Sequence, residues 1–405
     1  MDFLSIILYN RLNKEGDFML YTFMNKNYKL FDFEYDLKIN AITKIITLYD
    51  KERLPVNLYS LNEDELLNSF NTWLNQRYSR NSEWFKKQQW NYDFMKLTSN
   101  LVVKSYGLSL SDQYWIKPSN DNKAWEDVNF FTNEFSFVTN LKREYDYGSV
   151  DALYSPDITT GGEVDKAWLI NNDGTRVLYK SSNTFLGLEP INECIASKIC
   201  EILEIPHANY DIKIISNLDK KTMVSECATF INEDTELIPA YQLVKHSKNT
   251  EDEYNDYIKL LENNGIENVK DKVNKMLLLD VIMANCDRHL NNYGVIRDVN
   301  TLKWLDVAPI YDTGRSLATS YPTINSYDES IILFTYKCKR SDAFKFIKNI
   351  TLTKEQKSKL KDIPKIYENK LLEYLKYTNI EDNRKVNDIV DLLDKNIKQV
   401  LELLD

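Results

Sequence analysis

The sequence predicts an α+β protein in which a small sheet with one helix is joined to a larger helical lobe. Short apolar segments flank the hairpin-turn signal Asn172-Asp173-Gly174, which is typical of two paired strands. In residues 190–203 the isoleucines recur at helical spacing, and Pro190 suits the first turn of a helix. From Val273 onward the pattern is mostly helical, and this part of the chain provides the larger lobe.

The first 150 residues carry no motif with chemical meaning. Phe3 to Tyr9 is apolar but has no basic flank, so it is interpreted as a strand and not as a signal peptide. Aromatic segments alternate at 18–23 and 28–33. Asn62 and Glu65 form a capping-box pattern that predicts the start of a helix.

The elements expected after Asp157 divide into a small lobe and a helical lobe. The glycine pair Gly161-Gly162 lies between two candidate strands. The strands predicted for the small lobe are Ala167–Ile170, Arg176–Lys180, Tyr210–Ser216 and Thr222–Glu226. The larger lobe is predicted to contain helices at 273–284, from 353 onward and at 386–404, with a strand pair at 293–297 and 302–305. We therefore expect an N-terminal α+β region of unknown role (1–150), a small lobe (151–232) and a helical lobe (233–405).

Composition narrows the class of protein. The chain has 405 residues and a formal charge of −10, which argues against general binding to nucleic acid. Its 5 cysteines form no CxxC pair and it has 3 histidines, so neither a disulfide framework nor a structural zinc site is expected. No apolar stretch approaches the roughly 20 residues that a membrane helix needs. These features predict a globular cytoplasmic protein that does not bind a membrane.

The first segment with chemical meaning runs from Asp287 to Asn292. Its aspartate and asparagine are five residues apart, as in the catalytic loop of protein kinases. Phosphoryl transfer needs a carboxylate that accepts the proton of the attacking hydroxyl, and an oxygen ligand for Mg²⁺ on the same loop. Asp287 and Asn292 suit these tasks, and His289, with no second histidine or cysteine ligand nearby, is expected to orient the loop. Taken alone, the segment is equally compatible with a surface loop in which Asp and Asn stabilise turns.

The second segment is Asp312-Thr313-Gly314, which lies where kinases have Asp-Phe-Gly. It follows the strand pair after the catalytic loop, so its carboxylate can reach a metal that bridges the β- and γ-phosphates. Mg²⁺ prefers one or two carboxylates together with phosphate oxygens, and Asp312 with Asn292 forms a sensible pair. An aspartate in a turn or at a helix cap is the alternative.

The third segment runs from Thr159 to Lys180. Adjacent glycines allow backbone N–H groups to approach phosphate oxygens, and a lysine on a following strand can hold the α- and β-phosphates. The helix after Lys180 offers Glu193 or Glu189 as an ion-pair partner, and we favour Glu193 because it lies beside the apolar face. An exposed lysine at a strand end is the simpler explanation of this segment alone. All three segments in the order found in kinases are much harder to explain by chance.

Together these residues resemble the HipA family, the bacterial serine/threonine kinases of toxin–antitoxin systems. In that family the catalytic loop reads Asp-x-His-x-x-Asn followed by an aromatic residue, and the metal-binding aspartate follows Pro-x-Tyr. The matching positions here are Asp287, His289, Asn292, Tyr293, Pro309, Tyr311 and Asp312, together with 158–166, Lys180 and Asn192-Glu193. The resemblance covers Asp157 to Ser316 and implies a two-lobed protein-kinase-like fold.

The resemblance also implies roles for the matching residues. It makes Asp287 the base, Asn292 and Asp312 ligands of Mg²⁺, and Lys180 the nucleotide lysine, so that all four are catalytic. The residues implied to bind ATP are Thr160, Gly161, Gly162, Lys166, Lys180, Glu193, Glu226, Cys227 and His289.

Three of these implications are specific. Glu226 and Cys227 fall where the hinge of the family receives adenine, and would contact it through backbone groups. Lys166 would be a second basic residue near the glycine loop. Thr159 occupies the position of a serine that is autophosphorylated in the family, so Thr159 or Thr160 is a candidate for this modification.

The predicted activity is that of an ATP- and Mg²⁺-dependent serine/threonine protein kinase, a growth-regulating toxin whose partners are a protein substrate and an antitoxin. A lipid or small-molecule kinase is the alternative, since Asp-Arg-His-x-x-Asn also resembles the catalytic loop of phosphatidylinositol kinases. A third interpretation is a nucleotide-binding pseudokinase that serves as an interaction module. The presence of Asp287, Asn292, Asp312 and Lys180 argues against the third interpretation.

Overall fold

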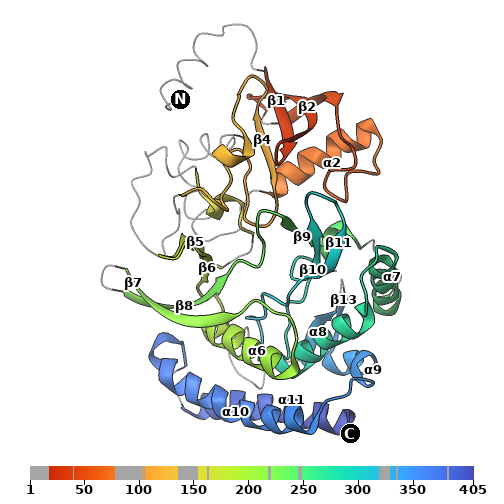
Figure 1. Cartoon of the computed structure of the whole chain (residues 1–405). Coiled ribbons are helices and arrows are strands. Elements are labelled where there is room, and N and C mark those ends of the chain that lie inside the picture. Colours follow the sequence, from red (N-terminus) through yellow and green to blue (C-terminus); the bar gives the residue numbers. More distant parts are fainter. Residues whose placement is uncertain are drawn as a thin grey trace. The chain divides into compact units, whose positions relative to one another are not determined.

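The structure is a computed structural model, and Figure 1 labels most of its helices and strands. It describes residues 18–39, 41–77, 103, 105–135, 154–161, 164–217, 220–244, 249–317, 319, 329–333, 336–380 and 383–405. The expected strand at 3–9 and Gly162 lie outside the described residues. The chain divides into two compact units, Met1–Ile170 and Asn171–Asp405. The predicted limits at residues 150 and 232 stay predictions.

The first unit contains an antiparallel sheet with the strand order β3-β2-β1-β4. The elements of this unit are β1 (Phe18–Asn25), β2 (Tyr28–Asp36), β3 (Ala41–Leu48), helix α2 (Glu63–Gln76), β4 (Tyr114–Pro118), the 3₁₀ helices Trp125–Asp127 and Pro156–Thr159, and β5 (Lys166–Ile170). The segment before the glycine pair was expected to be a strand, and this expectation is wrong. Pro156 at the first turn and the Ser155 hydroxyl, which accepts from the Asp157 N–H at 3.2 Å, start a 3₁₀ helix there.

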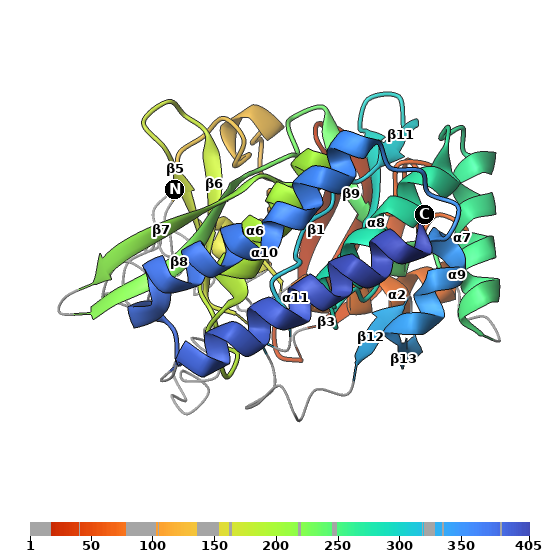
Figure 2. The ribbon, with the colours of Figure 1, turned by 90° about the horizontal axis from the view of Figure 1, so that it is seen from below.

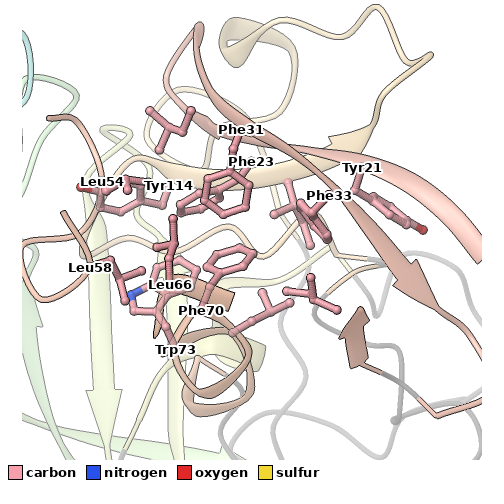
Figure 3. Close-up of a cluster of buried hydrophobic side chains, with 14 of the residues drawn as sticks. Tyr21, Phe23, Phe31, Phe33, Leu54, Leu58, Leu66, Phe70, Trp73 and Tyr114 are labelled. Atoms are coloured by element: carbon pink, nitrogen blue, oxygen red, sulfur yellow. The ribbon is translucent and has the colours of Figure 1, made fainter. Parts of the chain in front are cut away.

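Aromatic side chains form the core of this unit, between the sheet and α2 (Figure 3). The ring of Phe70 on α2 lies 4.7 Å from the rings of both Phe23 and Phe31. The helix begins where the sequence predicts, because the Asn62 side chain accepts from the Glu65 N–H and the Glu65 carboxylate accepts from the Asn62 N–H. The capping box therefore fixes the start of the helix that brings Phe70 into the core.

In the second unit, three strands are neighbours in the order β6-β8-β7 and pack on one helix. These elements are β6 (Arg176–Lys180), helix α6 (Glu189–Leu203), β7 (Tyr210–Asn217) and β8 (Lys220–Ala228). The strands and the helix predicted for the small lobe are thus present within a few residues of their expected limits. The isoleucines of α6 at 191, 195 and 199 are fully buried, as their spacing indicates.

The remainder of the second unit is mostly helical, as predicted. Its helices are α7 (Thr250–Asn263), α8 (Val269–Met283), α9 (Phe344–Ile347), α10 (Lys354–Tyr374), α11 (Asn383–Leu403) and the 3₁₀ helices Ala240–Gln242, Arg340–Ala343 and Leu375–Tyr377. Its strands are β9 (Thr235–Pro239), β10 (Gly294–Asp298) and β11 (Trp304–Val307) in one sheet, and the hairpin of β12 (Ser330–Leu333) and β13 (Tyr336–Lys339). Within the part of the chain that is described, no helix is both long and apolar enough to cross a membrane.

The two C-terminal helices support the helices that carry the site. Figure 2 shows α10 and α11 side by side, with α10 packed against α6 and α11 against α8. Helix α8 is buried on nearly all sides, as its run of apolar residues indicates. The loop that follows α8 is therefore anchored in the core of this unit.

Candidate active site

Lys180 lies at the end of β6 with its ammonium group between two carboxylates. Its Nζ donates to Glu193 of α6 and to Oδ1 of Asp312, the latter at 2.5 Å. Lys180 is 5% exposed and Glu193 is 1% exposed, so this ion pair is shielded from water. The strand register places Lys180 opposite Ser225 of β8, whose hydroxyl also donates to Glu193.

The charges of this cluster favour an additional cation. Burial alone would lower the pKa of Lys180, but the carboxylates of Asp312 and Glu193 outweigh it and hold this pKa well above its ordinary value. Burial raises the pKa of Glu193, while the charge of Lys180 acts in the opposite direction. Two carboxylates face one ammonium group, and the Asp312 side chain is 34% exposed. A divalent cation beside Asp312 would complement the remaining negative charge.

Glu189 has a different task from Glu193. Its carboxylate accepts from the hydroxyls of Ser182 and Thr184, and from the backbone N–H groups of Asn183 and Thr184 at 3.1 and 2.9 Å. It therefore organises the turn that joins β6 to α6. The structure brings Glu193, and not Glu189, to Lys180.

The backbone around Asp312 is unusual. Asp312 has φ +56°, and Leu317 a few residues later has φ +50°, both in the left-handed region. The Asp312 N–H donates to the hydroxyl of Tyr210 on β7 at 3.2 Å. A Cβ on Gly314 would lie 2.9 Å from the Cβ of Glu189, so the glycine permits the close approach of this segment to α6. The Asp-x-Gly pattern therefore has a structural reason: Asp312 lies in a tight bend, and Gly314 lies in close contact with α6.

The predicted catalytic loop begins directly after α8, where Ala284 has φ +48°. The side-chain Nδ2 of Asn292 and the backbone N–H of His289 both donate to the carbonyl of Asp287 at 2.8 Å. The Asp287 N–H in turn donates to Oδ1 of Asn285 at 3.1 Å. Because its Nδ2 is held by this carbonyl, Asn292 has Oδ1 as its remaining polar side-chain atom for a metal.

Two basic side chains flank the carboxylate of Asp287. Nη1 of Arg315 lies 3.7 Å from Oδ2, and Nε2 of His289 lies 3.9 Å from Oδ1. Arg315 comes from the segment after Asp312, and its carbonyl accepts from the Cys286 N–H at 3.0 Å. The Asp287 side chain is 24% exposed, so it is oriented from two sides and still reaches solvent.

Arg288 joins the loop of Asn292 to the segment of Asp312. The sequence alone assigned no role to this residue. Its guanidinium is 1% exposed and forms a two-pronged contact with Asp280 of α8, with distances of 3.0 and 2.9 Å. Its Nη1 also donates to the carbonyls of Asn292 and Tyr311, each at 2.7 Å. Asp280 within the apolar stretch of α8 was the available signal, since a charge in such a position is rarely buried without a partner.

Thr160, Gly161 and Lys166, which are expected to approach the phosphates, belong to the first unit. The hydroxyl of Thr159 donates to the carbonyl of Leu108 at 2.7 Å. The hydroxyl of Thr160 donates to the carbonyl of Pro156 at 2.8 Å. Nζ of Lys166 donates to the carbonyl of Gly161 at 2.6 Å.

The expectation for Glu226 and Cys227 needs a correction. Both residues lie inside β8, with partners on β6 and on β7. The N–H and C=O groups of a strand between two neighbours are used by the sheet, so these two residues have no backbone groups left for adenine. The chain leaves the sheet only after Ala228, where the Thr229 N–H makes a last bond to the carbonyl of Arg176 at 3.0 Å.

An apolar cluster lies beside the point where the chain leaves the sheet. Buried Tyr210 and Cys227 pack against half-buried Leu178, Phe230 and Tyr311. The rings of Phe230 and Tyr311 are 5.5 Å apart. Leu178 shares the face of β6 with Lys180, since alternate residues of a strand point to the same side. The side chain of Cys227, and not its backbone, therefore lies beside a surface suited to a flat ring.

These elements define a protein-kinase-like fold, in which a small sheet with its helix is followed by a helical lobe that carries the loops of Asp287 and Asp312. No family model matches the sequence, and no curated protein matches it. Among solved structures, the chain is similar to HipA of Shewanella oneidensis, a toxin–antitoxin protein solved with HipB and operator DNA. The TM-score is 0.51 at 12% identity, over 95% of this chain and 99% of that chain.

A second solved structure is the proinflammatory kinase CtkA of Helicobacter pylori, with a TM-score of 0.42 and 19% identity, over 60% of this chain and 91% of that chain. The likeness to HipA confirms the predicted two-lobed, HipA-like fold. It also extends over more of the chain than the segment from Asp157 to Ser316 on which the resemblance was based.

Proposed function

We propose that this protein is an ATP- and Mg²⁺-dependent serine/threonine protein kinase that transfers the γ-phosphoryl group to a protein hydroxyl. The observation that carries the proposal is the contact of Lys180 with both Glu193 and Asp312. In protein kinases the lysine–glutamate ion pair and the metal-binding aspartate must both be in place for phosphoryl transfer. The fold and the order of the three segments support the same conclusion.

The residues present fit a magnesium ion. Asn292 offers an amide oxygen and Asp312 a partly exposed carboxylate, which are the hard oxygen ligands that Mg²⁺ prefers. When bound with ATP, Mg²⁺ would neutralise charge on the phosphates. Arg288 keeps the two ligand-bearing segments together through the carbonyls of Asn292 and Tyr311.

The positions of the other residues suggest their roles in phosphoryl transfer. Lys180 orients the α- and β-phosphates, and Glu193 holds the ammonium group in place. Asp287 accepts the proton of the attacking hydroxyl, since its carboxylate is partly exposed and is oriented by Arg315 and His289. In this proposal His289 acts through Asp287 rather than on the nucleotide.

The proposed adenine site is the apolar cluster of Leu178, Phe230 and Tyr311, with backbone contacts from residues after Ala228. Thr160, Gly161, Gly162 and Lys166 are proposed to approach the phosphates. Autophosphorylation of Thr159 or Thr160 is part of the proposal, and it requires that these hydroxyls give up their hydrogen bonds to main-chain carbonyls.

The partners and the location extend the proposal. HipA of Shewanella oneidensis was solved together with HipB, so we propose that a protein antitoxin binds this chain as well. All 5 cysteines are free, as is usual in a reducing compartment, and this supports the proposal of a cytoplasmic location. A lipid or small-molecule kinase is the second candidate, favoured by the sequence Asp287-Arg288-His289 followed by Asn292.

The test is incubation of the purified protein with labelled ATP, Mg²⁺ and either a host lysate or phosphatidylinositol vesicles. Asp312→Ala removes the proposed metal ligand, and Asp306→Ala is the control, because Asp306 on β11 pairs with Lys272 outside the site. We expect labelled protein with the wild type and Asp306→Ala, and none with Asp312→Ala. Label in the lipid alone would select the second candidate, and label in neither would refute the proposal.

A further inference from the structure

Asn192, the residue before Glu193 on α6, is at the centre of a buried hydrogen-bond network. It is 0% exposed. Its Nδ2 donates to the carbonyls of Gly314 and Ser316 at 2.9 Å and to the hydroxyl of Thr319 at 2.8 Å. These contacts tie α6 to the segment that follows Asp312.

The other side of the Asn192 amide is bound by the C-terminal part of the chain. The hydroxyl of Tyr367 on α10 donates to Oδ1 of Asn192 at 2.6 Å. Tyr367 is 0% exposed, and burial raises the pKa of its hydroxyl, so it stays a neutral donor. Helix α10 also packs along α6 (Figure 2).

Tyr367 completes the hydrogen bonds of the Asn192 amide in the orientation that the structure has. A phenolic hydroxyl that donates to Oδ1 leaves both N–H bonds of the amide directed at the other side. If the amide were turned over, Oδ1 would face the carbonyls of Gly314 and Ser316, and three acceptors would meet without a donor. The carbonyls of Gly314 and Ser316 therefore fix the orientation of the amide, and Tyr367 supplies the donor that Oδ1 needs in this orientation.

We propose that Tyr367, acting through Asn192, is a positioning residue for the nucleotide centre. It holds α6 at a fixed distance from the Asp312 segment, and with α6 it holds Glu193 against Lys180. In many protein kinases the position of the corresponding helix is controlled by an activation step. Here helix α10 holds α6 in that position, so no separate activation step is needed to bring Glu193 to Lys180. This inference rests on the proposed kinase function.

The chain offers a matched control for the test. The hydroxyl of Tyr254 on α7 donates to Oδ1 of Asn274 on α8 at 2.7 Å, and both residues are buried. Tyr367→Phe and Tyr254→Phe thus remove the same group from the same kind of bond. Only the first of these bonds leads to the Asp312 segment.

The experiment compares both variants with the wild type. Calorimetric titration with Mg·ATP and a phosphorylation assay measure the centre, thermal unfolding measures stability, and hydrogen exchange of the protein without nucleotide measures the order of α6 and of 312–317. We expect similar losses of stability in both variants. Only Tyr367→Phe should weaken Mg·ATP binding and lower kcat/KM by roughly 5- to 20-fold, the worth of one or two hydrogen bonds. Only that variant should exchange faster in α6 and 312–317.

The outcomes separate this inference from the proposed function. A wild type that binds Mg·ATP but labels no acceptor would refute the kinase function, while the binding and exchange comparison would still decide the role of Tyr367. A wild type that binds no Mg·ATP would refute both. Equal effects of the two variants, or normal exchange and affinity in Tyr367→Phe, would overturn the positioning role.

Discussion

Replacing Arg288 by lysine tests how the proposed catalytic loop at Asp287 and the proposed metal-binding segment at Asp312 are held together. The substitution keeps the positive charge beside Asp280, so the buried carboxylate retains a partner. It removes the planar fork that reaches Asp280 with one edge and the carbonyls of Asn292 and Tyr311 with another. A single ammonium group cannot reach all of these acceptors.

The expected loss of stability follows from those contacts. Hydrogen bonds that involve a charged group are worth about 1.5–3 kcal/mol each. Nη1 of Arg288 makes two of them to main-chain carbonyls, both at 2.7 Å. The lysine ammonium group can replace some of these hydrogen bonds, so we expect Arg288→Lys to lower the free energy of unfolding by about 2–4 kcal/mol. The loops carry Asn292 and Asp312, and a displacement of about 1 Å can reduce turnover on the order of 10²-fold.

The control is Arg297→Lys on β10. Arg297 and Glu236 form a buried ion pair between β10 and β9, with a distance of 2.5 Å and exposed fractions of 5% and 1%. Both variants should show a lower midpoint in thermal unfolding. Only Arg288→Lys should lose turnover in the phosphorylation assay at a temperature where both are folded. Wild-type turnover in Arg288→Lys, or an equal loss in Arg297→Lys, would refute the reasoning.

Three further predictions concern the site and the helix that supports it. Asp287→Asn should keep its affinity for Mg·ATP and lose turnover by about 10²–10⁴-fold, which is the usual contribution of a positioned base. Lys180→Met should weaken both the affinity and the turnover. Calorimetry beside a phosphorylation assay tests the pair, and the reverse pattern would contradict the assigned roles. Asp312→Ala should abolish transfer with the fold retained, measured by labelling and circular dichroism, and unchanged labelling would exclude it as a metal ligand. Glu204 ends α6 with φ +55°, so Glu204→Gly should stabilise the protein by about 1 kcal/mol, and a lower thermal midpoint would count against this.

Local patterns were sufficient to predict several elements of the fold. The turn at Asn172-Asp173-Gly174, the isoleucines of α6 and the capping box at Asn62 each act within a few residues, so their positions could be predicted. The choice of Glu193 over Glu189 also followed from local geometry. It depended only on which side of α6 is apolar.

Contacts between distant segments could not be predicted in the same way. Arg288 binds the carbonyl of Tyr311, and Asn192 binds Tyr367, and no periodicity in the sequence relates such residues. The misplaced adenine contacts at Glu226 and Cys227 have a related cause. Whether a backbone group is available depends on which strands lie on both sides of β8, and this is a property of the sheet order.

The left-handed backbone conformation of Ala284, Asp312 and Leu317 lowers the stability of the fold around this site. Such a conformation costs roughly 1–2 kcal/mol for a residue with a side chain, and less for Asp and Asn. Glycine would relieve that strain at Asp312, but it would also remove the carboxylate that faces Lys180. Stability alone would therefore favour glycine at this position, and the fold carries the carboxylate that faces Lys180 at the expense of backbone strain.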